Sequence, residues 1–138
     1  MTDSKNFQKN DDDPESGCSV DVVDDGRVCY AYFLSSDGEI VGDVWLYNRC
    51  EAPMDPEWKD RTKAPCANPR GYAQNPPSFQ LPQNENEVVI RWSMDEQGCK
   101  FADILAHDLL IGRLGAGQKP GWARAAIKDG PLAKRLKE

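Results

Sequence analysis

Residues 27–47, RVCYAYFLSSDGEIVGDVWLY, contain the strongest structural signal in the chain. The runs 27–35 and 39–47 are rich in β-branched and aromatic residues, and Ser36-Asp37-Gly38 separates them. An Asp-Gly pair between two such runs is typical of a β-hairpin, because both residues tolerate positive φ at low cost. Both alternating sets of side chains in the first run are apolar, which indicates a central strand. The stretch therefore predicts a sheet at the centre of the fold.

Four more strands are predicted around this hairpin. Residues 19–23 precede it across the turn Asp24-Asp25-Gly26. Residues 87–94 alternate, with Val88, Ile90, Trp92 and Met94 predicted to point inward. Residues 99–106 and 109–114 follow, each after a polar turn, the second of which contains His107-Asp108. Together these runs predict an antiparallel β-meander of about six strands.

The C-terminal segment has a different pattern. Gly115-Ala116-Gly117 and Pro120-Gly121 interrupt the alternation, and residues 122–128, WARAAIK, have the composition of a short helix. Gly130 would end that helix, and Pro131 suits the first turn of a second one over residues 132–137. We expect both helices to pack on one face of the sheet. The predicted fold class is α+β.

The predicted domain organisation is a disordered acidic tail, residues 1–17, followed by a single globular α+β domain, residues 18–138. The tail is polar and nearly free of apolar groups. Within the domain, residues 49–86 form a long proline-rich excursion that holds seven of the ten prolines. Its aromatic residues, Trp58, Tyr72 and Phe79, favour an ordered loop wrapped over the sheet.

Composition narrows the class of protein. The chain of 138 residues carries a net charge of −6, which disfavours nonspecific nucleic-acid binding. No run approaches the ~20 apolar residues of a membrane span. The first residues lack the apolar core of a secretory signal, so we expect a cytoplasmic protein that contacts neither nucleic acid nor membrane.

The five cysteines, Cys18, Cys29, Cys50, Cys66 and Cys99, are predicted to be free thiols. No two lie closer than eleven positions, so the spacing of a zinc or iron–sulfur site is missing. Cys29 and Cys99 fall inside apolar runs, where cysteine serves as a small hydrophobic residue. We expect no metal and no cofactor.

His107 is the only histidine. It could act with a thiol and be oriented by Asp103 or Asp108, or carboxylates could act on the sheet face, as in a small hydrolase or transferase. No nucleophile elbow or phosphate-binding loop accompanies it. A polar turn residue beside Asp108 is the favoured interpretation, and no catalytic residue is assigned.

The favoured function is partner binding by a small acidic protein, and a toxin-neutralising immunity protein is its most concrete form. The loop 51–82 is predicted to supply aromatic anchors, because exposed aromatic residues dominate binding energy at interfaces. Its acids would steer a basic protein partner. The predicted partner-binding residues are Trp58, Tyr72, Asp55, Glu57 and Asp60. The alternatives are the small enzyme and an accessory domain of unknown role, and the oligomeric state stays open.

Overall fold

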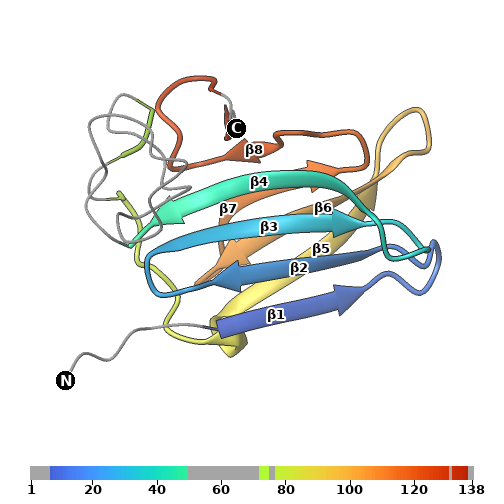
Figure 1. Ribbon diagram of the computed structural model, residues 1–138, viewed down its shortest axis with the longest axis horizontal. Coiled ribbons are helices and arrows are strands. Elements are labelled where there is room, and N and C mark those ends of the chain that lie inside the picture. Colours follow the sequence, from blue (N-terminus) through green and yellow to red (C-terminus); the bar gives the residue numbers. More distant parts are fainter. Residues whose placement is uncertain (1–6, 50–71, 75–76, 131, 137–138) are drawn as a thin grey trace.

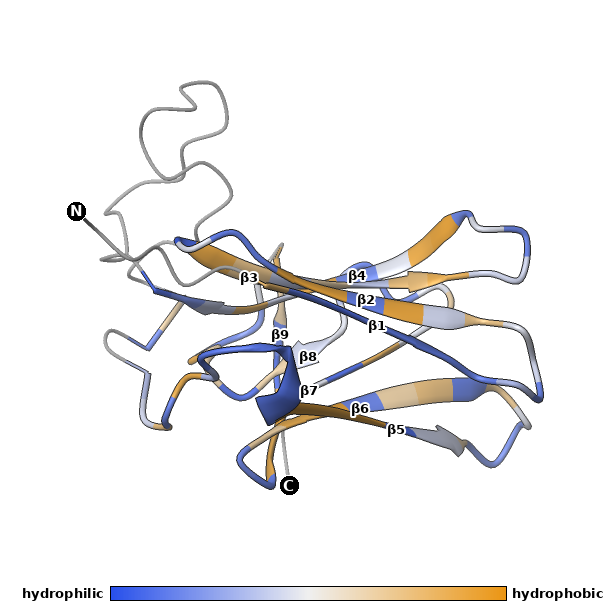
Figure 2. Ribbon diagram, turned by 90° about the horizontal axis from the view of Figure 1, so that it is seen from below, coloured by the Kyte–Doolittle hydropathy of each residue, from blue (hydrophilic) through white to orange (hydrophobic). Residues whose placement is uncertain are grey.

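Two β-sheets stack as separate layers in the computed structural model of this chain, which describes residues 7–49, 72–74, 77–130 and 132–136 (Figures 1 and 2). The first sheet has the order β1-β2-β3-β4 and the second β5-β6-β7-β8-β9. Within each sheet the strands follow one another in chain order. The N-terminal strands β1–β4 form one layer, and the C-terminal strands β5–β9 form the other.

The first sheet consists of β1 (Phe7–Asp12), β2 (Ser19–Asp24), β3 (Val28–Leu34) and β4 (Ile40–Asn48), all antiparallel. The second consists of β5 (Val88–Met94), β6 (Lys100–Ala106), β7 (Leu109–Gly115), β8 (Trp122–Ala123) and β9 (Lys134–Arg135). Among the described strands, β8 and β9 are the one pair that runs in parallel. The short 3-10 helix η1 (Glu85–Glu87) leads into β5. In the described part of the chain, no helix is long and apolar enough to cross a membrane.

The core lies between the two sheets. Alternate residues of β2, β3 and β4 point into it and are fully buried, among them Val20, Val22, Ala31, Phe33 and Val44. Ile104 and Leu114 face them from the second sheet. The Phe33 and Trp92 rings meet edge to face at 5.8 Å across the layers. Because successive side chains of a strand point to opposite faces, every second residue of these strands points to the outer face of its sheet.

The two sides of the sandwich are closed differently. On one side the edge of β4 is covered by backbone hydrogen bonds to the C-terminal segment, such as Asp43 N to Gln118 O and Trp45 N to Leu132 O. On the other side β1 and β5 are the edge strands. There the Trp92 indole donates a 2.7 Å hydrogen bond to Asp11, so a side-chain contact joins the layers.

The six strands predicted from alternation are confirmed, each within two residues of its observed ends. The central position of the strand after Arg27 is also confirmed, because β3 lies between β2 and β4. Met94 was predicted to point inward but is 52% exposed at the end of β5.

The α+β prediction is wrong, because the described residues contain no α-helix. The single meander of about six strands is also wrong, because β4 and β5 do not pair and the strands form two stacked sheets. Two stacked sheets bury the apolar face of each sheet against the other, so no helical cover is needed. Residues 122–128 and 132–137 were predicted as helices, yet the described residues among them form the short strands β8 and β9 and irregular segments. The physical reason is that the edge of β7 would otherwise be unpaired. Ala123 of β8 pairs with Gly112 of β7, so this segment is extended and not helical. Helices of this length gain little from propensity alone.

The predicted disordered tail also needs correction for its described part. Residues 7–12 form β1, which pairs along its whole length with β2. Asp13 accepts a 2.8 Å hydrogen bond from Ser16 and faces Lys100 of β6 at 3.3 Å, so the turn after β1 is held against the second sheet. Residues 1–6 lie outside the described residues.

Candidate functional site

The outer face of the first sheet carries a row of side chains that runs across all four strands. In register, Asn10 lies opposite Asp21, Asp21 opposite Tyr32, and Tyr32 opposite Asp43. Directly opposed residues of an antiparallel sheet point to the same face. Because Val20, Val22, Ala31 and Phe33 point into the core, this row points away from it.

Tyrosine and aspartate dominate this face. The Tyr30 and Tyr32 rings stack at 6.1 Å and 13°, and both are half-buried. Asn10 donates a 2.5 Å hydrogen bond to Asp21. We call Asp21, Tyr30, Tyr32 and Asp43 the acid–tyrosine face. It offers a rigid aromatic pair flanked by carboxylates.

The charge on this face has one sign. The outward positions of the four strands include three aspartates and no lysine or arginine, with Ile40 as the most exposed apolar residue at 52%. These positions include Gln8, Asn10, Asp12, Ser19, Asp21, Val23, Tyr30, Tyr32, Leu34, Ile40, Asp43 and Trp45. Trp45 is fully buried, and its indole donates to Asn48 at 2.7 Å. The face is therefore acidic as well as aromatic.

The outer face of the second sheet has the opposite character. One row in register joins Arg91, Asp103, Arg113, Trp122 and Lys134. Asp103 accepts two hydrogen bonds from Arg113, at 2.6 and 3.2 Å, which raise the pKa of that guanidinium. We call this row the basic–aromatic face. The two outer faces of the sandwich thus differ in charge.

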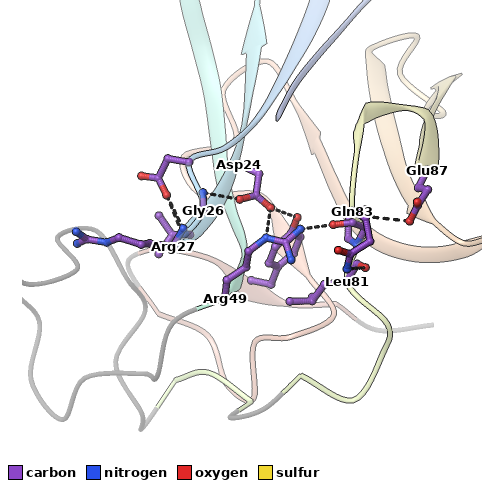
Figure 3. A network of polar contacts seen from close by, with 11 residues as sticks. Asp24, Gly26, Arg27, Arg49, Leu81, Gln83 and Glu87 are labelled. Carbon is purple, nitrogen blue, oxygen red and sulfur yellow. Dashed lines mark hydrogen bonds and ion pairs between the residues drawn. The ribbon is translucent and has the colours of Figure 1, made fainter. Parts of the chain in front are cut away.

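A buried polar cluster lies at the end of the first sheet (Figure 3). Asp24 is 1% exposed and accepts hydrogen bonds from Tyr47 Oη at 2.6 Å, Arg49 Nε at 2.7 Å and Gly26 N at 2.8 Å. Arg49 also donates to the carbonyl of Pro82, which ties the returning chain to β4. These bonds join β2 to β4 and β4 to the chain at Pro82, so the cluster holds this end of the first sheet together.

The thiol of Cys29 lies beside this cluster and is fully buried. Burial raises its pKa and also that of Tyr47, because water no longer solvates either anion. The thiol is therefore a poor nucleophile here, which agrees with the prediction that Cys29 packs as a small hydrophobic residue. The same prediction is wrong for Cys99, which is exposed in the turn before β6.

His107 lies in the hairpin turn between β6 and β7. His107 and Asp108 have φ values of 50° and 65°, as a two-residue turn with positive φ at both positions requires. The His107 Nε2 atom lies 3.0 Å from Glu87, which also accepts from the backbone N–H of Gln83 at 3.1 Å. This geometry suits a polar turn residue. Asp103, a possible orienting acid, is instead paired with Arg113.

Tyr72 is the one predicted partner-binding residue that the structure describes. It is half-buried, and its ring packs on the backbone at Gly130, where a Cβ would lie 2.6 Å away. Lys128 Nζ lies 4.6 Å from the ring centroid. Trp58, Asp55, Glu57 and Asp60 lie outside the described residues. The structure brings Tyr72 to the C-terminal segment, and its part in binding stays a prediction.

The described residues contain no candidate metal site. No group of three histidine, cysteine or acidic side chains is placed to hold an ion there. Cys18, Cys29 and Cys99 are free thiols, while Cys50 and Cys66 lie outside the described part.

Sequence reasoning missed the acid–tyrosine face. The alternation of Tyr30 and Tyr32 against Cys29 and Phe33 was visible, but both sets are apolar enough to be taken as core. Only the register with Asp21 and Asp43 shows which set points outward. No protein family model, curated protein or solved structure matches this chain, so the candidate site stands on its geometry.

Proposed function

We propose that this protein binds a partner protein with a basic surface through the acid–tyrosine face. The observation that carries the proposal is the row Asn10–Asp21–Tyr32–Asp43, with Tyr30 stacked beside it and no cation at the outward strand positions. A rigid antiparallel sheet presents these groups with little loss of entropy on binding.

Tyrosine and aspartate contribute to binding in different ways. A tyrosine ring supplies a large contact area with few rotatable bonds, and such residues are frequent hot spots. The carboxylates on this side of the first sheet, Asp12, which is exposed, and Asp21 and Asp43, which are half-buried, attract a basic surface over about a Debye length, roughly 10 Å at 0.1 M salt, and act mainly on association. The face therefore combines attraction and anchoring.

The most concrete form of this function is that of an immunity protein that neutralises a basic toxin. Small size and the acidic net charge of −6 support it. Trp58 and Tyr72, the anchors predicted in the loop, are a second candidate contact within the same proposal. Because immunity proteins are encoded beside their toxins, the product of the neighbouring reading frame is the partner to test.

The experiment measures binding kinetics between this protein and that product. Tyr32→Ala should speed dissociation by about thirtyfold, the equivalent of a 2 kcal/mol hot spot. Asp43→Asn should slow association at low salt and have less effect at high salt. Arg91→Gln, on the opposite face, is the matched control and should leave both rates unchanged.

Unfolding of each variant is measured alongside, because a loss of binding through misfolding would be uninformative. If the folded Tyr32→Ala variant binds like the natural protein while Arg91→Gln does not, the proposal is wrong. Faster dissociation in Trp58→Ala with no change in Tyr32→Ala would move the binding site to the loop.

A further inference from the structure

Two hollows adjoin on the basic–aromatic face, and they share Arg113 and Trp122 as walls. The first, of about 270 Å³, is completed by Asp129, Arg135 and Leu136. The second, of about 250 Å³, lies toward the turn between β5 and β6 and includes Lys100, Phe101 and Gln118. Each is just below the ~300–1,000 Å³ of ordinary ligand pockets, so the pair fits a small molecule.

The shared wall is held in a defined position. Arg113 makes two hydrogen bonds to Asp103 through Nε and Nη2, and its guanidinium carbon lies 5.1 Å from the centroid of Phe101. Guanidinium has five N–H donors in a fixed plane, and Asp103 uses two of them. A planar group fixed in this way is suited to bind an anion that enters either hollow.

More cations surround the first hollow. Arg135 lines it directly, and Lys134 Nζ lies 4.9 Å from the centroid of Trp122. The carboxylate of Asp129 is engaged locally, because its Oδ1 accepts from the backbone N–H of Arg135 at 2.8 Å. The backbone N–H of Arg135 therefore offsets part of the negative charge that Asp129 brings to the first hollow.

The acid in the second hollow is engaged in the same way. Asp95 Oδ1 accepts from the backbone N–H groups of Gln97 and Cys99, both at 2.9 Å. Lys100 also lines this hollow, but its ammonium is paired with Asp13 at 3.3 Å and Glu15 at 3.5 Å, so the cation that the second hollow offers is Arg113. Arg113 is thus the cation that the two hollows share, and one carboxylate oxygen of the acid in each hollow already accepts backbone hydrogen bonds.

We propose that this pair of hollows binds a small molecule that carries a phosphate or carboxylate group on an apolar or aromatic body. The anion would lie between Arg113 and Arg135, since charge-assisted hydrogen bonds to guanidinium are strong and directional. The apolar body would contact Trp122 and Leu136, which form the remaining wall. The site lies on the opposite sheet from the acid–tyrosine face, so it goes beyond partner binding and can be tested independently.

The experiment follows the indole N–H resonance of Trp122 in the full-length protein during titration at constant ionic strength. The chain has four tryptophans, and Trp122→Phe assigns the resonance. The probes are inorganic phosphate, phenyl phosphate, benzoate and, as the neutral control, benzamide. We expect saturable shifts with phenyl phosphate or benzoate, weaker binding of inorganic phosphate, and no saturation with benzamide. Tighter binding of phenyl phosphate than benzoate identifies phosphate as the preferred group, and the reverse identifies carboxylate.

Two variants distinguish a site from general attraction to a basic surface. Arg135→Gln should weaken binding by about tenfold, as expected for loss of a hydrogen bond to a charged group. Arg91→Gln removes a charge from the same row but lines neither hollow, so it should leave affinity within about twofold, since exposed charges act weakly. The absence of any saturable shift overturns the proposal, as does an equal effect of both variants or equal binding of benzamide and benzoate.

Discussion

Gly112 offers a direct test of how the two sheets pack. It lies in β7, and a Cβ placed on it would lie 2.3 Å from Cδ2 of Leu46 in β4. Leu46 is fully buried, so its side chain has no open space to enter. Gly112 is not among the glycines with positive φ, so the effect of Gly112→Ala is one of volume.

The expected cost follows from that distance. Carbon atoms pack best at about 3.5–4.0 Å, so the added methyl and Leu46 must separate by more than ~1 Å. Overpacking of this kind costs about 1–3 kcal/mol, and a clash so short belongs at the upper end. Replacing glycine by alanine in a strand returns ~0.5–1 kcal/mol. The net loss in free energy of unfolding should be about 2 kcal/mol, or about 8 °C in Tm.

The assay is urea unfolding of Gly112→Ala, Leu46→Ala and the double variant. Leu46→Ala alone should cost about 2–5 kcal/mol. In the double variant the new methyl enters the space that Leu46 leaves, so the double should be more stable than the sum by at least ~1 kcal/mol. Gly38→Ala is the control: its Cβ meets nothing within 4 Å, but its φ is +84°, so it should cost about 1 kcal/mol and be additive with Leu46→Ala. A neutral Gly112→Ala, or additivity with Leu46→Ala, would refute this packing.

Three further predictions concern buried or titrating groups. Tyr47→Phe removes a 2.6 Å hydrogen bond to the carboxylate of Asp24 and should cost about 1.5–3 kcal/mol in urea unfolding; a change below ~0.5 kcal/mol would contradict the cluster. The hydrogen bond from Ser16 lowers the pKa of Asp13 from 3.8, so its contribution to stability is complete above pH ~4 and is lost as pH falls through the lower folded pKa. Unfolding midpoints from pH 6 to 2 should therefore fall less steeply in Asp13→Asn, and an identical slope would count against this pairing. Burial raises the pKa of Cys29 whereas Cys99 is exposed, so a thiol reagent should modify Cys99 in the folded protein and Cys29 only on unfolding; early modification of Cys29, seen by mass spectrometry, would be inconsistent with the structure.

The alternation of apolar residues along the sequence was sufficient to predict the strands that show it. The hairpin around Asp37-Gly38 was predicted because the turn and both strands agree, and Gly38 has the positive φ that such a turn needs. The alternation of Val88, Ile90 and Trp92 likewise placed these three side chains on the inner side of β5. These features depend on neighbours within a few residues.

The C-terminal error shows where local pattern fails. Helix propensities differ by tenths of a kcal/mol per residue, so WARAAIK favours a helix only weakly. The free edges of β4 and β7 are better partners: Arg124 N donates to Ile111 O at 2.9 Å, and Leu132 O accepts from Trp45 N at 2.9 Å. Pairing with distant strands outweighs the local preference.

Pairing with distant strands also explains why neither β1 nor the candidate site was predicted. Residues 7–12 are too polar to predict a strand, yet they pair with β2, and Asp11 accepts from Trp92, 81 positions away. Local alternation of apolar residues and Asp-Gly pairs are enough to specify most of the strands and turns. That Tyr30 and Tyr32 point outward beside Asp21 and Asp43 follows from the packing of the two sheets, because register between strands is set by the burial of the opposite face.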